Sequence, residues 1–179
     1  MKKRIPLLVM LLALPFAGFL FNSCDESNVV ELDFDFNSAD IIFEVAADQQ
    51  TGTIELVETI VPTNLDSIFE ANNADISNIK SIYLKKCEFT ILSPEAQTFD
   101  ILSDMTSSIS AVDLAEVTIA SGFKSKIEKS CELNLQNVNL ADYLKKPSFT
   151  FKAVGVTTGP ITEPIQMKAS LKYKAKVGI

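Results

Sequence analysis

The sequence lacks histidine and tryptophan entirely. Without histidine, the chain can form neither the Ser–His–Asp nor the Cys–His arrangement of nucleophilic catalysis, and it has no imidazole ligand for zinc. Without tryptophan, it lacks a side chain that sugar-binding modules commonly use for stacking. We therefore expect a protein that is not an enzyme and that uses no cofactor.

Cysteine is scarce, with three residues in 179. Cys24 ends an apolar stretch, which leaves Cys87 and Cys131. If the chain is exported, an oxidising compartment permits a disulfide between these two. Their positions in alternating segments are also typical of two separate thiols in a core. Both alternatives stay open, but a catalytic role is not expected because no histidine exists to activate either thiol.

The first residues have the layout of an export signal. Residues 2–4 are basic, residues 5–21 are almost wholly apolar, and Ser23 precedes Cys24. A permanent transmembrane helix is the alternative, but the apolar run is about the shortest that spans a bilayer, and Pro15 interrupts it. We predict a lipoprotein signal peptide over 1–23, a short lipid-anchored linker over 24–28 and one domain over 29–179.

The expected mature protein is strongly acidic. The signal peptide holds three of the 16 Lys and Arg residues and none of the 23 acidic residues, so 13 positive and 23 negative charges remain, a net charge of −10. Nucleic acid and anionic lipid surfaces repel such a protein, so neither is an expected partner. The length and the apolar content suit one domain with a hydrophobic core.

Apolar and polar residues alternate with a period of two over most of the mature chain, which is typical of half-buried strands. In the clearest case, every second residue from Ile165 to Val177 is apolar and the residues between them are polar. Helical spacing is confined to two short segments, 64–71, which Asn64 can cap, and 140–146. We predict an all-β fold, an antiparallel β-sandwich that is Ig-like or jelly-roll-like, with one or two short helices.

The segment 79–92 changes the parity of its apolar residues at its middle. The residues of the first parity are Ile82 and Leu84, and those of the second are Cys87, Phe89 and Ile91. A β-bulge at Lys85–Lys86 would bring all five to one face of the sheet. Further along, we expect an irregular turn over 99–105 and a strand over 116–120 that Ser121–Gly122 closes.

Four lysines lie on the polar face of the last predicted strand, namely Lys168, Lys172, Lys174 and Lys176. Lysines commonly protect an edge strand from pairing with another chain, and we expect this role here. The alternative is that they face an acidic partner or an acidic neighbouring strand of the same domain.

These features together resemble small lipoproteins of the Bacteroidota that carry a β-sandwich domain of unassigned function. The resemblance rests on the lipobox-like Ser23–Cys24, the acidic pair Asp25–Glu26, the middle segment 98–102 and the long alternating final strand. It implies acylation of Cys24, for example with palmitate, and a place in the cell envelope, preferably at the outer membrane. It implies no other functional residue.

The spacing of Asp33, Asp35, Asn37 and Glu44 copies ligand positions of an EF-hand calcium loop. However, Ser38 occupies the position that needs glycine, and strands rather than helices flank the segment. The competing interpretation is that Asp33 and Asp35 form the solvent face of a strand. These four residues are the one metal candidate in the sequence, and we expect no other.

The expected function is that of a non-catalytic binding or assembly module, anchored to the cell envelope through a lipid on Cys24. Its expected partners are the membrane and an envelope protein or ligand that the sequence does not identify. Two alternatives remain. A carrier of a lipid or small apolar ligand would need an internal apolar cavity, and a fimbrial or adhesin-like subunit would need an unpaired strand edge.

Overall fold

The computed structural model describes residues 31–178, and these form an antiparallel sheet of nine strands. The strands are β1 (Glu31–Asn37), β2 (Ile41–Val45), β3 (Thr53–Pro62), β4 (Ile79–Ser93), β5 (Leu102–Ala111), β6 (Leu114–Ile127), β7 (Ser130–Leu135), β8 (Ser148–Thr157) and β9 (Ile165–Gly178). The helices are α1 (Leu65–Ala71) and α2 (Ala141–Leu144), with two short 3₁₀ helices, η1 (Ile76–Asn78) and η2 (Phe99–Ile101). The predicted signal peptide and linker, including Cys24, lie outside the described residues.

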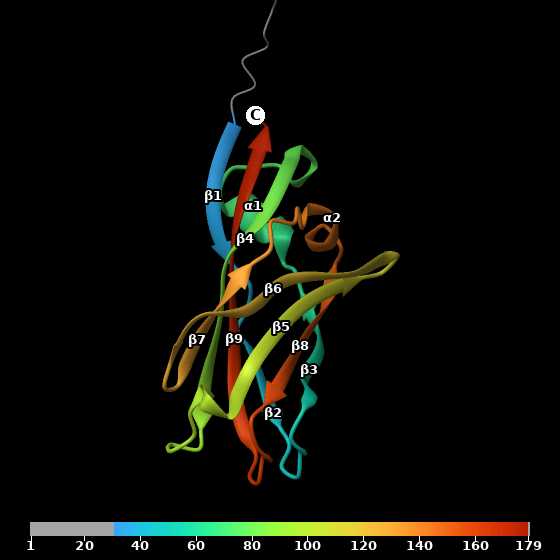
Figure 1. The fold of residues 1–179 in the computed structure, drawn as a ribbon. Helices are drawn as coiled ribbons and strands as arrows, with labels where there is room; N and C mark the ends of the chain where they lie inside the picture. Colours follow the sequence, from blue (N-terminus) through green and yellow to red (C-terminus); the bar gives the residue numbers. More distant parts are fainter. Residues whose placement is uncertain (1–30, 179) are drawn as a thin grey trace, which may run out of the picture.

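The sheet curls on itself, so that its two halves face each other across a common core (Figure 1). Its strands follow the order β1-β9-β4-β7-β6-β5-β8-β3, and β2 pairs with the first part of β9. Phe89 of β4 and Phe151 of β8 meet between the halves, with ring centroids 6.3 Å apart, although their strands are not neighbours in the sheet. The predicted all-β antiparallel sandwich is confirmed, and it consists of one continuous sheet.

The predicted bulge in β4 is confirmed. Leu84 is paired with Tyr173 of β9 and Lys86 with Lys172, so Lys85 is an extra residue in the ladder. As a result, the five apolar residues of both parities are all buried: Ile82, Leu84, Cys87, Phe89 and Ile91. A strand with this sequence and no bulge would expose one of the two groups, because successive side chains of a strand point to opposite faces.

The position of β9 contradicts the expected role of its lysines. β9 pairs with β1 and β2 on one side and with β4 on the other, so it is not an edge strand. The prediction that its lysines protect an edge is therefore wrong. The outermost strands are β1 and β2 at one end of the strand order and β3 at the other.

Both predicted short helices are present. α1 buries Leu65 and Phe69, and both α-helices lie in the half of the molecule where β1 begins and β9 ends (Figure 1). Asn64 precedes α1 with a φ of 48°, and its side chain makes no capping hydrogen bond. The expected capping role of Asn64 is therefore wrong, and the helix is held chiefly by its buried face.

The core is filled by large apolar side chains from both halves of the sheet. Gly155 of β8 makes room for two of them, because a Cβ at this position would lie 3.0 Å from Leu102 Cδ2 and 3.1 Å from Leu56 Cδ1. Tyr173 of β9 is also fully buried, and its ring stacks on Phe36 with centroids 5.2 Å apart. Among the described residues, the Tyr173 hydroxyl has no hydrogen-bond partner.

Two expected strand boundaries are wrong. The irregular turn expected over 99–105 is limited to η2, and β5 already begins at Leu102. β6 does not end at Gly122 but continues to Ile127. Gly122 has a φ of 68°, and the register of β6 against β7 shifts between Ser121 and Phe123. The glycine therefore serves as an irregularity within a long strand, which is a known use of glycine in sheets.

Candidate functional site

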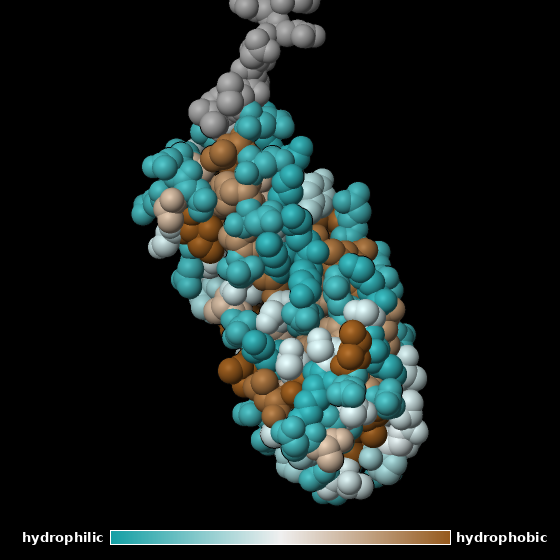
Figure 2. Space-filling view, turned by 90° about the vertical axis from the view of Figure 1, so that its left-hand side faces the viewer, coloured by the Kyte–Doolittle hydropathy of each residue, from teal (hydrophilic) through white to brown (hydrophobic). Residues whose placement is uncertain are grey.

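The lysines of β9 form ion pairs with acidic residues of β1 and of the β1–β2 connection. The four pairs, with their Nζ–O distances, are Lys176–Glu31 (3.8 Å), Lys174–Asp33 (2.6 Å), Lys172–Asp35 (3.3 Å) and Lys168–Asp40 (3.2 Å). We call these four pairs the charge ladder. The lysines thus face acidic residues of the same domain, which was the alternative interpretation. Hydrophilic residues predominate on the side of the molecule that carries β1, and hydrophobic ones form separate patches there (Figure 2).

Hydrogen bonds shift the pKa of four members of the ladder, namely Asp33, Asp35, Asp40 and Lys174. The bond from Lys174 is the main cause that lowers the pKa of Asp33 from its usual 3.8, and it also raises the pKa of Lys174. The pKa of Asp35 is lowered mainly by Lys85, whose Nζ lies 3.0 Å from the carboxylate, and further by Lys172. These shifts favour the charged forms of Asp33, Asp35 and Lys174. Each exposed pair stabilises little on its own, but cross-strand pairs favour one register of β1 on β9.

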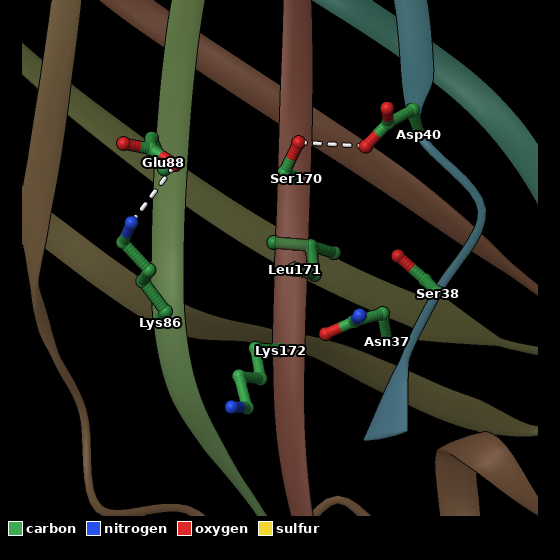
Figure 3. Close-up of a pocket in the computed structure, with 8 residues that line it drawn as sticks. All are labelled: Asn37, Ser38, Asp40, Lys86, Glu88, Ser170, Leu171 and Lys172. Atoms are coloured by element: carbon green, nitrogen blue, oxygen red, sulfur yellow. Dashed lines mark hydrogen bonds and ion pairs between the residues drawn. The ribbon is translucent and has the colours of Figure 1, made fainter. Parts of the chain in front are cut away.

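A hollow of about 450 Å³ lies where the chain passes from β1 to β2 over the outer face of β9 (Figure 3). It is lined by Asn37 at the end of β1, Ser38 and Asp40 of the connection, Ser170, Leu171 and Lys172 of β9, and Lys86 and Glu88 of β4. Ser170 Oγ donates to Asp40 Oδ1 at 2.7 Å, which is the main cause that lowers the pKa of Asp40. Lys86 Nζ donates to Glu88 at 2.9 Å. The two ammonium and two carboxylate groups balance, so the hollow does not select an ion of one sign.

The residues of the calcium candidate do not come together. Asp33 and Asp35 lie on the regular strand β1 and are bound to lysines, and the described residues contain no group of three or more acidic, cysteine or histidine side chains placed to hold a metal ion. Asp33 is opposite Lys176 of β9, whereas Glu44 is opposite Gln166, roughly 30 Å away along an extended strand. Asn37 lines the hollow of Figure 3 instead. The EF-hand spacing is therefore coincidental, because the four residues belong to two separate strands, β1 and β2. The calcium hypothesis is wrong.

Cys87 and Cys131 are free thiols in the structure, and both are buried. They lie on neighbouring strands, where Cys131 is paired with Phe89. Burial raises the pKa of each thiol from 9.0 to about 12, and Ser107 Oγ, 4.0 Å from Cys87 Sγ, offsets this only slightly for Cys87. Of the two alternatives, the structure contains two separate core thiols. Such thiols are poor nucleophiles because little thiolate forms near neutral pH.

A second hollow, of about 430 Å³, lies between β2 and β3, and no pattern in the sequence predicts it. Residues 39–43 line one side and residues 57–62 the other. Among the described residues β2 pairs with β9 alone and β3 with β8 alone, so β2 and β3 face each other without a hydrogen-bonded ladder. We call this hollow the β2–β3 groove. The period-two pattern predicts strands over most of the chain, but it does not indicate which strands become neighbours.

The carrier alternative depends on an internal apolar cavity. The two hollows described above are open to solvent rather than enclosed. Inside the sandwich, fully buried aromatic rings occupy the space between the sheet halves, namely Phe69, Phe89, Phe99, Phe149, Phe151 and Tyr173. These observations give the carrier alternative no support.

A comparison of the chain with protein-family models found no match, and a comparison with curated proteins found none. Within residues 31–178, no helix is long and apolar enough to cross a membrane.

Proposed function

We propose that the chain is a non-catalytic binding or assembly module of the cell envelope, held at a membrane by a lipid on Cys24. The observation that carries this proposal is where the first and last described strands begin and end. β1 begins and β9 ends at one end of an elongated domain, and the β2–β3 and β8–β9 connections lie at the opposite end (Figure 1). Six residues separate Cys24 from Glu31, which is a reach of roughly 20–25 Å. A lipid on Cys24 would therefore hold the first end near the membrane and direct the other end away from it.

The composition and the site support a binding role over a catalytic one. The chain has no histidine, and burial raises the pKa of both core thiols to about 12. The outer face of β9 is occupied by residues that bind one another in the charge ladder. The free edges of β2 and β3 favour one of the alternatives, an adhesin-like subunit that pairs strands with a neighbour, as a special case of the same assembly role.

Replacement of the lipidated residue tests the anchor. We expect the wild-type protein to stay in the membrane pellet through a high-salt wash, because bacterial lipoproteins carry more than one acyl chain and one chain alone holds a protein only marginally. The Cys24→Ser variant should be released or mislocalised, while its domain unfolds at the same urea concentration. Mass spectrometry of the mature N-terminus should find an acylated Cys24, and an unmodified Met1 would refute the anchor.

A pull-down from intact membranes tests the binding role. We expect the wild-type chain to recover an envelope component that the Cys24→Ser variant, no longer anchored, recovers poorly. If no partner is recovered and the purified domain hydrolyses a model glycoside or ester, the proposed function is wrong.

A further inference from the structure

The β2–β3 groove combines two free strand edges with exposed apolar side chains. Ile42 of β2 is 60% exposed and Ile60 of β3 is 71% exposed, and both line the groove. Ala39 and Pro62 also belong to the lining. Edge strands present backbone N–H and C=O groups that a further strand can bind, and exposed isoleucines beside such an edge offer an apolar contact.

The edges also carry features that protect against unwanted pairing. β2 has only five residues, β3 has a register shift between Glu55 and Val57, and Pro62 ends β3. These features explain how the domain avoids pairing with any strand that it meets. They do not explain Ile42 and Ile60, because protection alone favours a charged side chain at an exposed position on an edge. The exposed isoleucines are therefore available for contact with a further segment.

The charges around the groove indicate the chemistry of that segment. Three glutamates, Glu44, Glu55 and Glu58, and one aspartate, Asp40, lie on or beside the two strands. Lys152 is shared between Glu55 and Glu58, with both distances 3.0 Å, and Lys168 pairs with Asp40. Four acids against two lysines leave an excess of negative charge, which attracts a basic segment. A second copy of this chain would bring its own acidic rim against the first, and the two rims would repel.

We propose that the β2–β3 groove binds an extended segment of a partner protein in which apolar side chains alternate with polar ones and basic residues flank the apolar run. This inference rests on the proposed binding role and names its site and the chemistry of the partner. The apolar side chains of the segment would contact Ile42 and Ile60, and its backbone would bind the free edge of β2 or β3. The basic residues would meet Glu44 and the Glu55–Glu58 pair.

The test uses the full-length chain in detergent and a phage-displayed library of random linear peptides as the probe. We expect the selected peptides to share alternating apolar residues with flanking lysine or arginine. Ile60→Glu and Ile42→Glu should each weaken the binding of a selected peptide about tenfold or more, because they place a charge against its apolar side chains. Glu44→Lys should weaken binding and reduce its dependence on salt concentration.

Val112→Glu and Ile127→Glu are matched controls, because these side chains are 71% and 70% exposed and belong to the β5–β6 connection and to the end of β6. They should leave binding unchanged. The inference is wrong if the library yields no binder, or if the selected peptides bind the Ile60→Glu variant as tightly as the wild type.

Two outcomes separate the groove from its alternatives. A concentration-dependent dimer in analytical ultracentrifugation that Ile60→Glu abolishes would show that a second copy occupies the groove, and this would overturn the inference. If Ile60→Glu still recovers the envelope component in the pull-down, the groove is not the binding site, but the proposed binding role stands. If the pull-down fails for the wild type and the peptides still bind the groove, the proposed role fails and the groove remains a peptide site.

Discussion

Tyr173 is an unusual residue for the centre of this core. Its ring stacks on Phe36, but its hydroxyl is buried without a hydrogen-bond partner among the described residues. Burial, with a further contribution from Cys87, raises the pKa of the hydroxyl far above its usual 10.0, so it stays protonated and polar inside an apolar environment. A buried polar group without a partner lowers stability by about 1–3 kcal/mol.

Removing this hydroxyl should therefore stabilise the domain. We expect Tyr173→Phe to raise the free energy of unfolding by about 1 kcal/mol, measured by urea denaturation. Tyr143→Phe is the control, because the Tyr143 hydroxyl donates to the Ala115 carbonyl oxygen at 2.9 Å, and its loss should lower stability or leave it unchanged. A loss of stability in Tyr173→Phe would contradict the expectation and indicate a bound water at the hydroxyl.

At the scale of elements, β1 depends on its partner more than any inner strand does. It pairs with β9 alone, and its seven residues alternate between exposed and half-buried, with none fully buried. β5, in contrast, pairs with both β6 and β8 and contains five buried residues. The charge ladder therefore supplies a share of the interactions that hold β1, and β1 should be the first strand to detach.

A charge swap tests this dependence. Asp33→Lys places a third ammonium group beside Lys174 and Lys176, so we expect the amides of β1 to lose protection from hydrogen exchange while those of β5 keep it. The double variant Asp33→Lys with Lys174→Asp restores an opposite-charge pair and should restore the protection. If the double variant is as unprotected as the single one, the charges do not hold β1.

The same ladder sets a pH window for β1. Because the folded-state pKa values of Asp33, Asp35 and Asp40 lie below 3.8, their contribution is complete above that value and is lost as the pH falls through the lowered pKa values. Because the pKa of Lys174 lies above 10.5, its contribution is complete below 10.5 and is lost at higher pH. In an acid titration followed by NMR, the resonances of β1 should move toward unfolded values before those of β5.

The elements also show how far the sequence can predict this fold. The period-two alternation of apolar and polar residues was sufficient to predict that strands form and that a bulge lies at Lys85. Both follow from which side chains must face the core. The alternation failed for β9, whose lysines have the same pattern whether an edge or an acidic strand lies beside them. It failed at Gly122 because a glycine can end a strand or lie at an irregularity within it. The β2–β3 groove depends on two strands that do not pair, so no local pattern predicts it.

At the scale of the whole molecule, the first two strands pair with the last strand. β1 and β2 both pair with β9, and Glu31 lies directly opposite Gly178. The ends of the described domain are therefore neighbours in the sheet, which is the arrangement that tolerates circular permutation. The connection between β8 and β9 offers a site for new ends, because a Cβ built on Gly159 would meet no atom within 4 Å.

We expect a permuted domain to fold in which a hairpin loop of about two to five residues joins Gly178 to Glu31 and the chain is opened between Gly159 and Pro160. The pairing of β9 with β1 then becomes local in sequence, so refolding after dilution from urea should be faster than in the natural order. Failure of the permuted domain to fold would contradict this. It would show that the β8–β9 connection is needed for the structure.

The antiparallel pairing of β1 with β9 also decides how the domain responds to mechanical load. β1 runs from one end of the molecule along its length, so a force that pulls on Glu31 away from the domain acts along the strand (Figure 1). The backbone hydrogen bonds between β1 and β9 are then loaded in shear at the same time, rather than broken one after another. Forced unfolding is governed by the rate of the rupture step. If the domain is pulled at Glu31 and held at its far end, the load therefore acts on the whole β1–β9 pairing at once.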